Sequence, residues 1–319
     1  MPARQGQTPM QPVAQRHPTQ TDDARARRRR YKEPCAAMDA AVFQETFNMA
    51  ANPRQQAAVI TGAAGGIGLG LAHALAAQGY ALALADIDAD ALEAARAALA
   101  RDGATVVAVP TDVGDARQIT HLCDESFRQL GRVDLLFNNA GVLATGRCWE
   151  LPPEVFDKVM RVNLWSVLHA LRCFVPRMVA QGSGHIVNVA SMAGLAVGPW
   201  LAPYTLSKQG VVALSEGLAL ELQAAGLPIK VSVVCPGPVA TGIAADLDGA
   251  APQEVHQMNG ALRNGIAAGL TPDQAARVIL DGVSAGQFWI LPHEQAAHAA
   301  LARAQGIAAG SAPSFAMQV

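Results

Sequence analysis

Charged residues, aromatic residues and cysteines are all scarce in this 319-residue chain, at 16%, 5% and five in number. Because 51% of the residues are hydrophobic and so few are charged, the chain as a whole cannot be disordered. With so few aromatic rings, and with 29 glycines, close packing of backbones is favoured over a β-sandwich. The net charge of −2 excludes a broad basic surface for nucleic acid.

The cysteine pattern excludes a disulfide framework. The cysteines are odd in number, widely spaced and form no CxxC motif (Cys35, Cys123, Cys148, Cys173 and Cys235). The eight histidines are equally scattered, so we expect no metal site. Reduced thiols are typical of a cytoplasmic protein, and we expect the chain to act in the cytoplasm.

Long uninterrupted apolar runs are missing too. Two stretches without a charged residue lie between Arg54 and Asp86 and between His185 and Lys208, but glycines, prolines and amides interrupt them. A membrane-spanning helix needs about 20 mainly apolar residues. Neither stretch contains such an apolar run. The N-terminal residues also contain no apolar signal-peptide core. We therefore expect no membrane partner.

The N-terminus carries a concentration of basic residues. Residues 1–34 hold eight basic and three acidic side chains, which leaves 16 basic and 23 acidic side chains for the rest of the chain. Residues 1–53 are rich in Pro, Gln and Arg and show no sustained period, which predicts a disordered N-terminal extension. The arginine run at residues 27–30 could be an arm for nucleic acid or a partner. We favour a solvated tail, or translated sequence upstream of a start at Met38 or Met49, and expect no nucleic-acid binding.

From residue 57 onward, short apolar runs alternate with helical stretches. The expected strands are residues 57–61, 81–85, 105–109, 134–137, 185–189, 230–234 and 288–291. The main expected helices are residues 89–101, 116–129, 153–174, 204–225 and 272–285, together with one that follows the first strand. Strands that are apolar throughout are typical of a parallel sheet buried on both faces, and repeated strand–helix units predict a doubly wound α/β fold. No linker divides residues 54–295, which predicts one domain followed by a C-terminal tail at 296–319.

A glycine-rich turn follows the first expected strand, and it contains Gly62, Gly65, Gly66, Ile67 and Gly68. Glycines let the backbone turn sharply and approach a pyrophosphate, and the helix that follows offers free N–H groups. An ordinary tight turn is the alternative. The position between a strand and a helix favours a nucleotide-binding turn.

Acidic residues follow the second and third expected strands. Asp86 comes 24 residues after Gly62, where a carboxylate can accept hydrogen bonds from both ribose hydroxyls and repel a 2′-phosphate. Neither Gly65 nor Ile87 is basic, so the pattern predicts NAD(H) in preference to NADP(H). A simple strand-end cap is the alternative for Asp86. Asp112 follows the third strand, where it could meet the adenine amino group.

Tyr204 and Lys208 are four residues apart on an expected helix, so their side chains share one face. A nearby ammonium favours phenolate and would lower the tyrosine pKa from about 10, so that the tyrosine can exchange a proton with an alcohol or ketone. Ser191 lies 13 residues earlier, where its hydroxyl could bond the same substrate oxygen. A surface pair is the alternative for the tyrosine and lysine alone.

The order and spacing of these motifs resemble those of the short-chain dehydrogenase/reductase family, over roughly residues 55–292. The resemblance also includes the Asn-Asn-Ala-Gly run at 138–141, Asn163, and Pro236-Gly237 followed by Thr241. It implies a Rossmann-like, seven-stranded parallel sheet of order 3-2-1-4-5-6-7 with helices on both faces.

The same resemblance implies roles for individual residues. Tyr204 would be the general acid/base, Lys208 would lower its pKa and hold the nicotinamide ribose, and Ser191 would orient the substrate oxygen. Asn163 would fix a water in a proton relay. The cofactor would also be bordered by Val113, Asn139, Ala140, Gly141, Pro236, Gly237 and Thr241.

The expected substrate is small, and three segments should border it: residues 142–149, 192–203 and 240–270. The first two are largely apolar, with Arg147 their only cation. We therefore expect a hydrophobic or aromatic secondary alcohol or its ketone. By analogy with the family, we expect a homodimer or homotetramer. The competing hypothesis is a non-catalytic, nucleotide-sensing protein of the same fold.

Overall fold

Seven parallel strands form the centre of the structure, a computed structural model that describes residues 55–247 and 252–313. The strands are β1 (Ala57–Thr61), β2 (Ala81–Asp86), β3 (Val106–Pro110), β4 (Leu135–Asn138), β5 (Gly184–Val189), β6 (Ile229–Val234) and β7 (Trp289–Ile290). Their order in the sheet is β3-β2-β1-β4-β5-β6-β7. The predicted fold class and strand order are confirmed.

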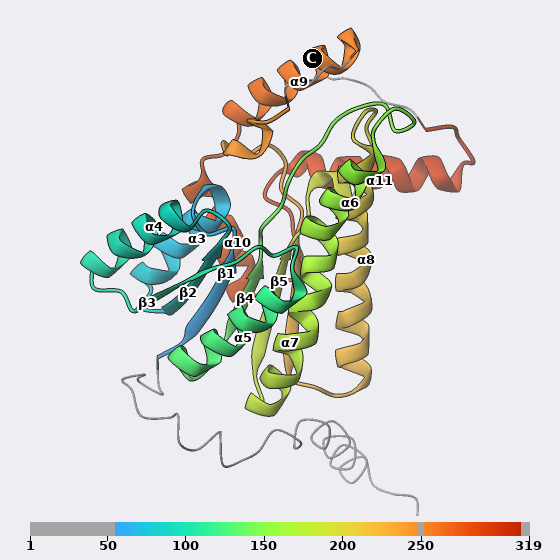
Figure 1. Ribbon diagram of the computed structural model, residues 1–319. Helices are drawn as coiled ribbons and strands as arrows, with labels where there is room; N and C mark the ends of the chain where they lie inside the picture. The colour runs from blue at the N-terminus through green and yellow to red at the C-terminus, as the bar shows by residue number, and fades with distance from the viewer. Residues whose placement is uncertain (1–54, 248–251, 314–319) are drawn as a thin grey trace, which may run out of the picture.

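Helices cover both faces of this sheet (Figure 1). On one side lie α3 (Gly66–Ala77), α4 (Ala89–Arg101) and α10 (Pro272–Ser284). On the other lie α5 (Ala116–Leu130), α7 (Ser166–Gln181) and α8 (Ala202–Ala224). The structure further contains α6 (Pro153–Met160), α9 (Gln253–Ala267) and α11 (Glu294–Ala308).

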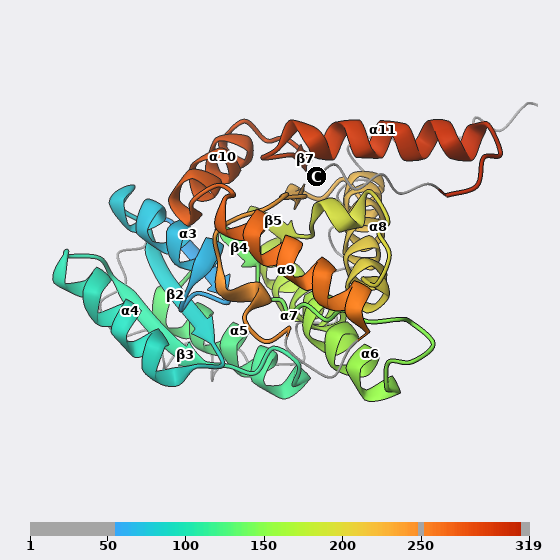
Figure 2. The ribbon, with the colours of Figure 1, turned by 90° about the horizontal axis from the view of Figure 1, so that it is seen from above.

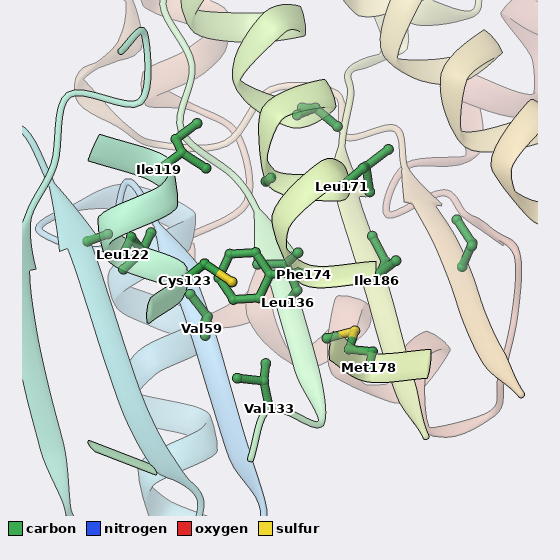
Figure 3. Packing of buried hydrophobic residues seen from close by; sticks show 14 of the residues in the cluster. Val59, Ile119, Leu122, Cys123, Val133, Leu136, Leu171, Phe174, Met178 and Ile186 are labelled. Atoms are coloured by element: carbon green, nitrogen blue, oxygen red, sulfur yellow. The ribbon is translucent and has the colours of Figure 1, made fainter. Parts of the chain in front are cut away.

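Alternate residues of each strand pack into two separate cores. In β1, Val59 faces the helices α5 and α7, whereas Ile60 faces α3 and α10. Figure 3 shows the first core, where Phe174 of α7 lies against Leu136 of β4 and Cys123 of α5. These side chains are fully buried. Burial on both faces explains why the strands are apolar throughout.

The long helix expected at residues 153–174 differs from the prediction in two ways. Residues Arg161–Trp165 form a π-helical turn between α6 and α7, and the helix continues past Pro176 to Gln181. It ends at Gly182, which adopts the left-handed conformation that suits glycine. Turns of this π type are frequent at functional sites, and this one carries Asn163.

The predicted tails at the two ends of the chain have different outcomes. The predicted disordered extension, residues 1–53, lies outside the described residues. The predicted boundary of the C-terminal tail, at residue 296, falls inside α11, an alanine-rich helix that extends outward past the end of α8 (Figure 2). Alanine is the strongest helix former, which accounts for a helix there. Within the described ranges, no helix is long and apolar enough to cross a bilayer.

Candidate active site

A cavity of about 1360 Å³ lies at the carboxyl edge of the sheet. It is lined by residues at or just beyond the carboxyl ends of β1 to β6, among them Gly62, Asp86, Asp112, Asn139 and Ser191. Carboxyl ends of parallel strands meet at one edge, which is where open α/β sheets bind ligands. Figure 2 looks down on this edge, with α9 crossing over it. The cavity exceeds the roughly 300–1,000 Å³ of a site for one small ligand, so it has room for a dinucleotide and a substrate.

The structure brings the predicted site residues together. All of them line this cavity except Gly68 and Asn163, which lie just behind its wall. The residues that line it are Gly62, Gly65, Gly66, Ile67, Asp86, Asp112, Val113, Asn139, Ala140, Gly141, Ser191, Tyr204, Lys208, Pro236, Gly237 and Thr241.

The glycine-rich turn forms an open cradle at the start of α3. Gly62 and Gly66 have φ angles of +65° and +51°, which side chains rarely tolerate. A Cβ at Gly68 would lie 2.0 Å from the carbonyl oxygen of Gly62, so only glycine lets the helix approach the turn this closely. No side chain caps α3, and its first turn holds no acidic residue, so its N-terminal N–H groups are available to an anion. A pyrophosphate fits this cradle.

Asn139 and Thr61 tie this turn to the loop after β4. The Asn139 side-chain amide donates to the carbonyl of Thr61 at 2.9 Å and to that of Gly62 at 3.2 Å. In return, the Thr61 hydroxyl accepts hydrogen bonds from the backbone N–H groups of Asn139 and Ala140. The two loops that would hold opposite sides of a dinucleotide are therefore fixed to each other.

Asp86 lies at the end of β2 with its carboxylate at the cavity wall. One oxygen accepts a hydrogen bond of 3.0 Å from the Ala64 N–H, and the other accepts one of 3.2 Å from the Asp88 N–H. Each carboxylate oxygen can accept a second hydrogen bond, so both remain able to receive a ribose hydroxyl. The neighbouring lining residues Ile87 and Ala91 carry no positive charge.

Asp112 stabilises its own loop as well as lining the cavity. Its carboxylate accepts a hydrogen bond of 2.8 Å from the Gly114 N–H, and its own N–H donates to the side chain of Gln118. The adjacent Val113 is buried in the core beside α5. The loop after β3 is thus held rigidly at the cavity wall.

Tyr204, Lys208 and Ser191 meet in the middle of the cavity. Lys208 is 3% exposed, its Nζ donates a hydrogen bond of 2.9 Å to the carbonyl of Val189, and it lies 5.7 Å from the centroid of the Tyr204 ring. Burial lowers the pKa of Lys208 to about 8. The loop with Ser191 follows directly from β5, so strand and helix α8 together place the three side chains.

The spacing of Tyr204 and Lys208 predicted a lowered pKa for the tyrosine. That prediction is wrong, because the pKa of Tyr204 is raised. Burial raises the pKa of Tyr204, and a hydrogen bond with the Ser191 side chain opposes that rise. The loss of water around the phenol disfavours its charged form, and the Lys208 ammonium donates its hydrogen bond to the Val189 carbonyl.

Asn163 lies behind the wall, in the π-helical turn. Its side chain accepts a hydrogen bond of 2.8 Å from the Val142 N–H and donates to the Val142 carbonyl at 2.9 Å and to Ser207 at 3.0 Å. A Cβ at Gly141 would lie 3.3 Å from both Asn163 Oδ1 and Lys208 Nζ. Gly141 therefore lets the loop after β4 pass close to both side chains.

Part of the cavity lining is aliphatic. It is formed by side chains from three segments: Leu143, Val197, Leu201, Met258, Leu262 and Ile266. These are the segments expected to border the substrate. Arg147 does not line the cavity but pairs with Glu150 at 2.9 Å and with Glu254 of α9.

Sequence reasoning did not single out five residues in or beside this site, three of which lie in the segment 240–270 that was expected to border the substrate. Met258, Leu262 and Ile266 of α9 follow one another at four-residue spacing, a signal of a shared helix face that could have identified them. Lys158 also lines the cavity, and no motif pointed to it. His293 contacts the loop at Gly237 from 56 residues away, and no local pattern marks such a contact.

The fold and the cavity define a class of protein, the dinucleotide-dependent oxidoreductases. The model of the short chain dehydrogenase family matches residues 56–251, and the chain therefore belongs to that family. A 1-deoxy-11-beta-hydroxypentalenate dehydrogenase from Streptomyces exfoliatus is 39% identical over 189 residues, covering 58% of this chain and 68% of that protein.

Solved structures of similar proteins contain both kinds of nicotinamide cofactor. A short-chain dehydrogenase/reductase from Burkholderia phymatum in complex with NAD has a TM-score of 0.79 and 34% identity, covering 83% of this chain and 98% of that one. A short-chain dehydrogenase from Sphingobium yanoikuyae in complex with NADPH has a TM-score of 0.65 and 27% identity, covering 82% of this chain and 99% of that one. These similarities support a nicotinamide cofactor for the cavity.

Proposed function

We propose that this chain is an NAD-dependent oxidoreductase that interconverts a hydrophobic or aromatic secondary alcohol and its ketone. One observation carries the proposal. Ser191, Tyr204 and Lys208 line the same cavity as the glycine-rich cradle and a set of aliphatic side chains. A substrate held against these aliphatic side chains would present its oxygen to the two hydroxyl groups.

Tyr204 would act as the general acid/base in this reaction. During alcohol oxidation its phenolate oxygen takes the hydroxyl proton, while the Ser191 hydroxyl orients the reacting oxygen. The nicotinamide, when bound, supplies the acceptor for the hydride. Because burial disfavours the phenolate, the reaction depends on positive charge beside Tyr204, and Lys208 supplies it.

Asn163 and Gly141 position the parts of this site. Both polar atoms of the Asn163 amide hold the backbone of Val142, whose side chain lines the cavity. Through Ser207 the same amide is connected to helix α8, which carries Tyr204 and Lys208. Asn163 would thus hold the loop after β4 in a fixed position relative to α8. A water relay would pass beside it.

The preference for NAD(H) over NADP(H) rests on Asp86. Its carboxylate is fixed by backbone N–H groups at the point where the adenosine ribose would lie. A 2′-phosphate there would face a negative charge, and the neighbouring Ile87 and Ala91 offer no cation to offset it.

The preference for a hydrophobic substrate rests on the aliphatic part of the cavity lining. Its aliphatic residues come from α9 and from the loops after β4 and β5. Arg147, the cation expected in this region, is paired with two glutamates and does not line the cavity. A carboxylate or phosphate on the substrate would therefore find no partner in Arg147.

We also propose a cytoplasmic homodimer or homotetramer. Trp165, Leu206 and Leu220, on and beside α7 and α8, are large apolar side chains that are about half exposed or more, and Trp289 of the edge strand β7 is 40% exposed. Large apolar side chains exposed on the surface of a monomer can be buried against another subunit. The four cysteines in the described part of the chain are free thiols, which suits a reducing compartment.

An assay with a panel of secondary alcohols tests the proposed function. The purified protein is mixed with NAD⁺ and, in parallel, with NADP⁺, and reduced cofactor is measured by its absorbance. We expect turnover of aliphatic or aromatic secondary alcohols with NAD⁺. A folded protein that binds NAD⁺ but turns over no alcohol would favour the non-catalytic, nucleotide-sensing alternative.

A further inference from the structure

The imidazole ring of His293 binds the loop that follows β6. Its Nδ1 accepts a hydrogen bond of 3.0 Å from the Gly237 N–H, and its Nε2 lies 3.0 Å from the carbonyl oxygen of Pro238. A carbonyl oxygen can only accept, so Nε2 carries the proton and donates. Both ring nitrogens are thus used by two successive residues of one loop.

The ring also fits closely against the backbone. A Cβ at Gly237 would lie 3.0 Å from Cγ and 3.3 Å from Nδ1 of the His293 ring. Any side chain at residue 237 would therefore push against the ring. The glycine and the histidine form a matched pair, although they are 56 residues apart.

The loop held by His293 connects several parts of the cavity. Pro236, Gly237 and Thr241 line it, and the Pro236 carbonyl accepts a hydrogen bond of 2.8 Å from the N–H of Met192, the residue after Ser191. At its other end, Thr241 lies so close to Gly66 that a Cβ there would be 2.9 Å from its methyl group. A shift of this loop would therefore also displace both the Ser191 loop and the glycine-rich turn.

The ring serves this loop and not its own helix. His293 immediately precedes α11, but its side chain makes no capping hydrogen bond to that helix. Only the backbone carbonyl of His293 does so, accepting from the N–H of Ala296 at 3.0 Å. Replacing the side chain would remove the contacts to the loop and leave this backbone hydrogen bond in place.

We propose that His293 is a positioning residue for the nicotinamide cofactor, because it locks the Gly237–Pro238 loop against the cavity. This inference rests on the proposed function, since it assumes that the cavity binds NAD(H). His293 does not line the cavity itself and acts through Gly237. The C-terminal segment that begins at His293 is thereby part of the cofactor site.

Two substitutions and a matched control test this inference. His293→Ala removes both hydrogen bonds. His293→Asn keeps an amide oxygen near the position of Nδ1, where it can accept from the Gly237 N–H. His298→Ala removes an exposed histidine from the adjoining helix α11. NADH affinity is measured by fluorescence titration without any alcohol, and hydrogen exchange is measured on peptides that cover residues 234–241.

We expect His293→Ala to weaken NADH binding about tenfold, the effect of losing two modest hydrogen bonds, and to speed exchange at Gly237. His293→Asn should recover part of both losses, and His298→Ala should match the wild type. Unchanged NADH affinity in His293→Ala would overturn the inference, as would equal losses in the Ala and Asn variants. A wild-type protein that binds no NADH would instead contradict the proposed function itself.

Discussion

The carboxylate of Asp86 accepts a hydrogen bond of 3.0 Å from the backbone N–H of Ala64, inside the glycine-rich turn. This contact joins the end of β2 to the cradle at the start of α3. The Asp86 carboxylate, which would accept hydrogen bonds from the adenosine ribose, is therefore fixed to the glycine-rich turn, which would hold the pyrophosphate. In the proposed function, the carboxylate that selects the cofactor and the turn that binds its phosphates would be joined by this hydrogen bond.

Asp86→Asn should reduce the preference for NAD⁺. Charge-assisted hydrogen bonds to the ribose would be weakened, so kcat/KM with NAD⁺ should fall about 10- to 100-fold. The value with NADP⁺ should rise, because the repulsion of the 2′-phosphate is removed. Asp90→Asn, an exposed acid in the first turn of α4, is the control. An NAD⁺ preference that survives Asp86→Asn unchanged would show that another residue sets it.

Gly68→Ala should abolish cofactor binding. The new Cβ would lie 2.0 Å from the Gly62 carbonyl oxygen and 2.8 Å from the Asn139 amide, so the turn and the loop after β4 must both move. The control is Gly217→Ala in α8, where the new Cβ would meet no atom within 4 Å outside the neighbouring backbone of its own helix. That control should stabilise the protein by about 0.5–1 kcal/mol. Titration with NADH and thermal melts measure the two effects, and a Gly68→Ala variant that binds NADH normally would contradict the proposed cradle.

Helix α9 should close the cavity through its contacts with the loop after β4. The Thr145 hydroxyl donates to Asn259 Oδ1 at 2.7 Å, and the Asn259 amide donates to the Leu247 carbonyl at 2.8 Å. Because Asn259 is 1% exposed, Asn259→Ala should raise the substrate KM about tenfold by leaving these buried groups unpaired.

The ion pair between Arg147 and Glu254 should matter less than Asn259. Both side chains are about one third exposed, and such pairs contribute only about 0–1 kcal/mol. Glu254→Gln should therefore change the substrate KM by less than about fivefold, and added salt should reduce the difference. The control is Glu221→Gln, an exposed position near the far end of α8. If Glu254→Gln raised the substrate KM more than Asn259→Ala does, Asn259 would not be the main residue that holds α9 in place.

His185 should make the protein sensitive to acid. Its Nε2 lies 2.7 Å from the Ser232 hydroxyl between β5 and β6, and burial, aided by the charge of Lys230, lowers its pKa to about 4. The unfolded chain, with a histidine pKa near 6.5, binds this proton first as the pH falls. Stability is therefore complete above about pH 6.5 and declines toward pH 4, by at most about 1.4 kcal/mol per pH unit.

Urea denaturation at pH 7 and pH 4.5 measures this decline. His185→Gln should flatten the pH dependence, whereas His121→Gln, at an exposed position of α5, should leave it as in the wild type. The same pH dependence in His185→Gln and in the wild type would assign the acid sensitivity to other groups.

Local sequence was sufficient to predict the strands and several residues of the cavity wall, whereas the strand order and the rest of the predicted wall came from the family resemblance. Apolar runs predicted the seven strands, and the residues at their ends, such as Gly62, Asp86 and Ser191, meet because all the strands point the same way. The spacing of Tyr204 and Lys208 predicted their shared helix face correctly. Features governed by residues close in sequence or by strand direction could therefore be predicted.

Features that depend on tertiary contacts could not be predicted from local sequence. The π-helical turn occurs where Asn163 binds Val142, 21 residues away, and no local propensity encodes that contact. The contact between His293 and Gly237 spans 56 residues. The pKa of Tyr204 depends on how much water burial removes, which sequence spacing alone does not give.

Comparison of the wild type with Tyr204→Phe is the most direct test of the central claim, that Tyr204 performs the proton transfer beside a bound nicotinamide. Both proteins are assayed for NADH formation with the best alcohol of the panel and for NADH affinity without alcohol. We predict a loss of turnover of about 10²- to 10⁴-fold, the usual contribution of a general acid/base, with little change in NADH affinity because the ring is kept. Turnover in Tyr204→Phe equal to that of the wild type would contradict the account.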